Sequence, residues 1–145
     1  MSLVIDIADA VTAELNAAPP GTFTPSFTAM RRVLPEFDLA DLADLKVSVV
    51  PKRVEITGST RSASQYEIAV DIGVQKKLGK DLDSEVAALS TLVDQIADYL
   101  RRRPLGAAPF ASWVSISNEP VYAPEHLAEQ RVFTSVLTVS YRALK

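Results

Sequence analysis

The fold is decided by residues 66–103, which read YEIAVDIGVQKKLGKDLDSEVAALSTLVDQIADYLRRR. Apolar residues occupy every second position from Tyr66 to Val74, and this alternation predicts a strand with one buried face. Beyond it, Leu, Val and Ile recur at alternating steps of four and three, which predicts a long helix from Leu82 to Arg103. Asp81 and Asp83 are candidate N-caps, and proline and glycine follow the last arginine. The centre of the chain is therefore a strand followed by an amphipathic helix.

Upstream of this centre, the pattern predicts one further helix and several short extended segments. Apolar residues spaced by three and four predict a helix from Leu3 to Ala17, ended by prolines. Residues 22–33 are rich in Thr and Phe and predict an edge strand, and residues 35–45 repeat Asp-Leu-Ala with the period of a short helical turn. Alternation over residues 45–58 predicts two short strands or one bent strand. The small, polar residues 58–64 predict a loop between antiparallel strands.

Downstream, two segments alternate again after a loop rich in Pro, Gly and Ala at residues 104–109. They predict strands from Trp113 to Tyr122 and from Arg131 to Arg142, joined by a connection with one helical turn over residues 124–130. The whole chain, residues 1–145, is expected to form a single α+β domain. Its mainly antiparallel sheet would be covered by the N-terminal helix and the one long helix.

Composition limits the classes of function. The chain has 145 residues, 48% hydrophobic and 23% charged, with a net charge of −3 and no cysteine. These values fit one globular domain and exclude disulfides, zinc fingers and thiol nucleophiles. The opening residues lack a basic region and carry Asp6 and Asp9 within the apolar run, so we expect neither a signal peptide nor a membrane span. A soluble protein made in the cytoplasm, without a membrane partner, is the expectation.

The chain shows no catalytic signature. No glycine-rich phosphate loop is present. The chain has a single histidine, His126, and no GxSxG motif that would supply a nucleophilic serine for it to activate. Two groups of acids are weak candidates, one for a hard cation and one for glycosidic acid and base chemistry, since helical spacing spreads the first group over a solvent-facing side and sequence fixes no separation within the second. They are Asp38, Asp41 and Asp44, and Glu119, Glu125 and Glu129. We therefore predict no catalytic residue, no metal and no cofactor.

Basic residues form four short clusters that admit two interpretations. One interpretation is phosphate contact, and the other is compensation of helix dipoles, strand-end solvation or interface salt bridges. The clusters are Arg31-Arg32, Lys52-Arg53, Lys76-Lys77 with Lys80, and Arg101-Arg102-Arg103. Successive helical residues are rotated by 100°, so three adjacent arginines cannot all reach one ligand. The second interpretation is favoured.

The order of segments resembles that of small tail-assembly proteins of tailed bacteriophages, specifically the tail terminator (tail completion) group and its prophage copies. The resemblance is carried by layout rather than by one diagnostic motif, and it spans nearly the whole chain. The segments are the N-terminal helix 3–17, VLPEFDL at 33–39, LKVSVVP at 45–51, YEIAVDIGVQKK at 66–77, the long helix, EHL at 125–127 and VFTSVLTVSYR at 132–142.

This resemblance implies an assembly role. Such proteins form a hexameric ring that caps the head-proximal end of the tail tube, ends tube polymerisation and docks the head-completion or connector protein. It implies a homo-oligomer that contacts the tail tube protein and lets DNA through its lumen without specific binding, with acidic groups facing that lumen. The location would be the virion tail, after assembly in the cytoplasm of a bacterial host.

Loop residues are the candidate contacts with a neighbouring subunit or the tube, from the polar loop and the arginine cluster: Gly58, Ser59, Thr60, Arg61, Ser62, Arg101, Arg102 and Arg103. The Pro/Gly loop at 104–109 is a further candidate. Two alternatives stay open. One is another neck component, such as a head-completion or tail-adaptor protein. The other is a small ligand-binding domain or enzyme with a pocket around Trp113 and His126.

Overall fold

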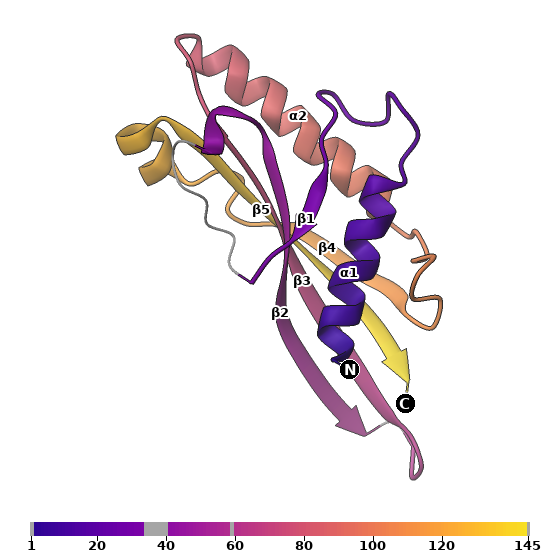
Figure 1. Cartoon of the computed structure of the whole chain (residues 1–145). Coiled ribbons are helices and arrows are strands. Elements are labelled where there is room, and N and C mark those ends of the chain that lie inside the picture. Colours follow the sequence, from indigo (N-terminus) through magenta and orange to yellow (C-terminus); the bar gives the residue numbers. More distant parts are fainter. Residues whose placement is uncertain (1, 34–40, 59, 145) are drawn as a thin grey trace.

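The computed structural model describes residues 2–33, 41–58 and 60–144, which form one sheet and two long helices (Figure 1). Two one-turn helices, η1 and η2, lie in connections. In chain order the elements are α1 (Leu3–Asn16), β1 (Ala29–Arg31), η1 (Asp41–Ala43), β2 (Lys46–Gly58), β3 (Ser64–Lys77), α2 (Leu82–Leu100), β4 (Ser112–Asn118), η2 (His126–Gln130) and β5 (Val132–Leu144). The predicted α+β class is confirmed.

The sheet has the strand order β1-β2-β3-β5-β4. Three of its four junctions are antiparallel, as expected, but β1 runs parallel to β2, so the sheet is mixed. β2 and β3 form a long hairpin that pairs from Lys46 and Gln75 down to Gly58 and Ser64. The edges of the sheet are the short β1, which covers only residues 47–49 of β2, and β4.

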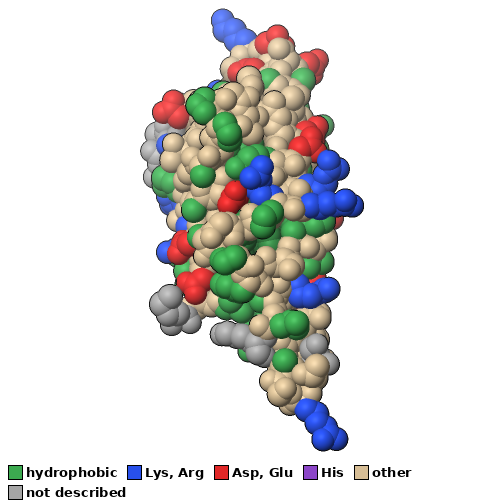
Figure 2. Space-filling view, turned by 90° about the vertical axis from the view of Figure 1, so that its right-hand side faces the viewer, with side chains coloured by type: hydrophobic (Ala, Val, Ile, Leu, Met, Phe, Trp, Pro, Cys, Tyr) green, Lys and Arg blue, Asp and Glu red, His purple; other side chains and the backbone are tan. Residues whose placement is uncertain are grey.

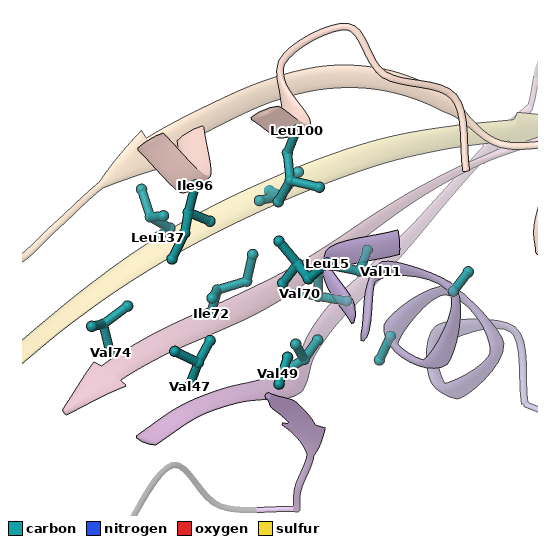
Figure 3. Packing of buried hydrophobic residues seen from close by; sticks show 14 of the residues in the cluster. Val11, Leu15, Val47, Val49, Val70, Ile72, Val74, Ile96, Leu100 and Leu137 are labelled. Atoms are coloured by element: carbon teal, nitrogen blue, oxygen red, sulfur yellow. The ribbon is translucent and has the colours of Figure 1, made fainter. Parts of the chain in front are cut away.

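Both helices pack on one face of the sheet. The alternate residues of β3 from Ile68 to Val74 and of β5 from Leu137 to Ala143 point to this side and are buried with apolar residues of the two helices. Figure 3 shows Val11 and Leu15 of α1, and Ile96 and Leu100 of α2, meeting Val49, Val70, Ile72 and Leu137 of the strands. Burial of this single cluster is the main stabilising contribution to the fold.

In the described part of the chain, no long helix covers the opposite face of the sheet. Its upper part is buried near η1, where Leu42, Ser48 and Gln75 are almost inaccessible. Its middle is polar: the Thr138 hydroxyl donates to Asp71 Oδ1 at 2.6 Å, and Lys52 Nζ lies 3.6 Å from the same carboxylate oxygen. The prediction that β3 has one exposed face is therefore wrong for its upper half.

The region before β2 differs from the predicted edge strand over residues 22–33. Only Ala29–Arg31 is a strand, while Phe23 stacks on Phe27 and meets Tyr99 of α2 edge-on, with ring centroids 4.8 and 5.4 Å apart. Asn16, the last residue of α1, closes the outer edge of β1: its amide oxygen accepts from Ala29 N–H at 2.8 Å and its amide nitrogen donates to Ala29 C=O at 3.0 Å.

The two strands or one bent strand expected over 45–58 are one strand, β2, with an extra residue between Pro51 and Arg53. The predicted helical turn over 35–45 is observed only as η1, because residues 34–40 lie outside the described ranges.

The long helix ends earlier than predicted. Asp81 caps α2 by accepting from Ser84 N–H at 3.3 Å, whereas Arg101 leaves helical geometry with ψ 120°. Arg101–Arg103 therefore follow the helix instead of forming its last turn. β4 also ends early, at Asn118 rather than Tyr122, just before Pro120. The strand predicted to start at Arg131 is confirmed as β5 and runs on to Leu144.

Candidate assembly interface

The hairpin arm is the most exposed part of the sheet. We use this name for residues 52–58 of β2, the turn 60–63 and residues 64–66 of β3. Every described residue from Lys52 to Ser62 is exposed, and the arm extends past the start of α1 (Figure 1). Thr60 holds the turn, since its backbone N–H donates to Ala63 C=O at 3.1 Å and its hydroxyl accepts from Ala63 N–H at 3.0 Å.

The arm carries four of the described interface candidates, Gly58, Thr60, Arg61 and Ser62; Ser59 lies outside the described residues. In the space-filling view the arm forms the narrow lower end of the molecule and finishes in a basic side chain (Figure 2). Residues 58–63 contain one basic residue, Arg61. The prediction of a polar loop between antiparallel strands is confirmed, although the strands extend further toward the turn than expected.

Two apolar side chains on the arm are exposed, and the sequence pattern did not single them out. Val54 and Ile56 alternate with polar residues, which predicts burial, yet they remain 39% and 57% exposed. They pair with Ile68 and Tyr66 of β3 and so point to the helix-covered side of the sheet, beyond the part that the helices cover. Exposed apolar residues on a strand at the rim of a sheet leave that strand available for pairing with another chain.

The backbone of the arm is also unpaired on one side. β1 pairs with β2 only up to Val49, where Arg32 N–H donates to Val49 C=O at 2.9 Å. Within the described residues, no backbone hydrogen bond reaches residues 53–58 from the side away from β3. β4 on the far edge is likewise bonded only to β5. The sheet thus presents one unpaired edge at each of its two sides.

The arginine cluster lies elsewhere. Arg103 folds back on its own chain, with its guanidinium 3.9 Å from the Tyr99 ring centroid, its Nε donating to Tyr99 C=O at 2.9 Å and its Nη1 3.4 Å from Glu14 Oε2. Arg101 and Arg102 are exposed, and Arg102 has φ 60°. This cluster follows the C-terminal end of α2, far from the tip of the arm (Figure 1). The two groups of predicted contacts are therefore not brought together.

Trp113 and His126, the residues of the alternative ligand pocket, lie at opposite ends of β5. Trp113 pairs with Tyr141, whereas His126 Nδ1 is 2.9 Å from the Thr134 hydroxyl, seven positions earlier on the strand. A shallow hollow next to Trp113 is lined by arginines and prolines of the loop before β4. Burial raises the pKa of Tyr141, and the charge of Glu14 adds to the rise.

The remaining candidate residues that the structure describes do not gather into a site. Lys52 and Arg31 each lie in an ion pair, with Asp71 and Asp9 respectively. Among the residues with described placement, no three acidic or histidine side chains stand close enough to hold a metal ion. Asp38 falls in the range 34–40 and is outside the description, and Glu119, Glu125 and Glu129 are each exposed.

No protein-family model matches the chain, and no curated protein matches it. No helix in the described ranges is both long and apolar enough to cross a bilayer.

Proposed function

We propose that this chain is a structural subunit of a bacteriophage or prophage tail, a tail terminator. Copies of it form a hexameric ring on the head-proximal end of the tail tube. The ring ends tube polymerisation and offers the surface on which the head-completion protein docks. Its location is the virion, after assembly in the bacterial host.

The observation that carries this proposal is the hairpin arm, with Val54 and Ile56 exposed on an unpaired strand. In water such an edge favours pairing with another chain, and proteins that work alone usually shield it with charges, prolines or bulges. Here the bulge, Pro51 and the charged Lys52 and Arg53 stand at the start of the arm and Glu55 points to its uncovered face, yet Val54 and Ile56 stay exposed on the other face. This fits a subunit whose work is done through contacts with other protein chains.

Passage of DNA without specific binding is consistent with the charge arrangement. The net charge is −3, and three cations of the described surface, Arg31, Lys52 and Arg103, are engaged with carboxylates of the same chain. Nucleic-acid binding without base readout depends on free Lys and Arg along the path of the backbone. Cations held in ion pairs contribute less to such binding.

The experiment is a polymerisation assay with the tail tube protein of the same phage. Tube lengths are measured by electron microscopy with and without the purified chain. A terminator shortens the tubes and appears as an added ring at one end only. Tubes of unchanged length with bare ends would contradict the proposal, and binding to the head connector without any effect on tube length would favour another neck component.

A further inference from the structure

We propose that the unpaired edge of the arm, residues 53–58 of β2, pairs with β4 of a second copy of this chain, and that the two sheets become continuous across the junction. The proposal specifies the subunit contact of the ring and rests on the proposed function for the number of copies. Three features of the two edges support this junction: the direction of the strands, the backbone groups that point away from the sheet, and the face of the sheet to which the side chains of those residues point.

Strand direction allows the junction. β5 is antiparallel to β3, as β2 is, so β2 and β5 run the same way and β4 runs opposite to them. In a ring whose strands are tilted from its axis, as in a β-barrel, every copy keeps the same strand direction. β4 of one copy then meets β2 of the next antiparallel. The contact uses two different edges, which is the heterologous contact that a closed ring requires.

The outward backbone groups can be identified on both edges. Glu119 N–H donates to Val136 C=O at 3.0 Å. Hydrogen-bonded and non-bonded pairs alternate along an antiparallel ladder. The backbone groups of Ser117 therefore bond to β5, while those of Ile116 and Asn118 point away from β5. On β2, the Val49 C=O group points away from β3 and accepts from Arg32 N–H. Along the strand, residues whose backbone groups face β3 alternate with residues whose groups face away from it, and the extra residue of the bulge shifts this alternation by one position.

Beyond the bulge the outward residues of β2 are Val54, Ile56 and Gly58. Antiparallel bonded pairs place their two side chains on the same face, so the outward residues of both edges must point the same way. They do: Val54 pairs with the core residue Ile68, and Ile116 of β4 pairs with the core residue Val139. A continuous sheet therefore keeps the helices of both copies on one side.

The register is the one that pairs both outward residues of β4, Ile116 and Asn118, with the two outward apolar residues of the arm, Val54 and Ile56. Ile56 lies opposite Ile116, and Val54 lies opposite Asn118. The non-bonded pair between them is Glu55 with Ser117, whose side chains point to the uncovered face. Ser117 opposite Glu55 avoids facing like charges. A β2–β2 contact between copies would leave both β4 edges unpaired, so we favour the β2–β4 junction.

The chain has no cysteine, so engineered disulfides report the junction directly. Non-bonded antiparallel pairs have Cα atoms about 4.5 Å apart, within the range that a disulfide spans. E55C and S117C proteins are mixed at high concentration, oxidised and separated on a non-reducing gel. Both parent side chains are exposed, and circular dichroism verifies that each variant folds. A covalent dimer that forms in the mixture and disappears with reductant is the expected result.

Three controls make the result specific. Each single variant alone should remain monomeric on the gel, and E55C mixed with S115C, displaced by two residues, should cross-link at least tenfold less. Cross-linking of E55C alone to the same extent would establish a β2–β2 contact and overturn the proposal. No dimer in the E55C and S117C mixture, with both proteins folded, would also overturn it.

The double variant E55C/S117C separates this inference from the proposed ring. Its largest disulfide-linked species should contain six chains. A cross-linked ladder that continues beyond six, or closes at another number, would refute the hexameric ring and leave the β2–β4 junction intact. Six copies in solution with no cross-link would retain the ring and refute the junction.

Discussion

Replacement of Ile56 by serine should weaken assembly while leaving the subunit folded. The Ile56 side chain is 57% exposed in the single chain. Full burial of an isoleucine contributes about 1.5–3 kcal/mol, so covering the exposed part at a junction contributes roughly 1–2 kcal/mol. The dissociation constant of one junction should therefore rise about 5–30-fold, because 1.4 kcal/mol corresponds to a factor of ten.

Sedimentation velocity over a concentration series measures this shift. The matched control is Leu144→Ser, which removes a side chain that is 63% exposed but belongs to β5, an internal strand. Its assembly midpoint should equal that of the parent. The reasoning fails if I56S assembles at the parent concentration, or if L144S weakens assembly as much, with both proteins showing the parent circular dichroism spectrum.

Three further predictions concern the subunit itself. Asn16→Ala removes both hydrogen bonds to Ala29 and should lower the free energy of unfolding by about 1–3 kcal/mol in urea denaturation; an unchanged midpoint would show that β1 is held by other contacts. Asp81→Ala removes the acceptor for Ser84 N–H and should cost about 0.5–2 kcal/mol, seen as a lower Tm, and an equal Tm would argue against the cap. Tyr141→Phe removes a buried hydroxyl for which the described residues offer no hydrogen-bond partner, so stability at pH 7 should be equal or higher. Burial raises the pKa of Tyr141 in the folded chain, so the Tyr141 hydroxyl of the unfolded chain ionises at lower pH. The parent should therefore lose stability as pH rises above about 10, and the variant should lose less. Parallel profiles of stability against pH for the two proteins would contradict this.

The elements that sequence predicted well are those with long, regular periodicity. β3 and α2 each carry five or more apolar residues at the spacing of their own structure, so local pattern and burial agree. The predicted end of α2 at Arg103 was wrong: the helix stops at Leu100, and Arg103 contacts the Tyr99 ring and the Glu14 carboxylate. That contact joins residues 89 positions apart in the chain, which no local pattern contains.

β1 and the arm illustrate the other limit. β1 has three residues, and its place at the sheet edge depends on Asn16 of α1 and on parallel pairing with β2. The loop at the tip of the arm was predictable from its polar composition. The unpaired edges were not, because they depend on the strand order, and Val54 and Ile56 follow the same alternation as buried residues of β3.

Whether the chain forms a ring is tested first by the mass of the purified protein in solution. Light scattering of the protein without tail tubes, over a series of concentrations, should give six times the subunit mass of 15.7 kDa at the highest concentrations. A mass that stays at one subunit at every concentration, both alone and with tube ends added, would contradict the account of this chain as a ring-forming subunit.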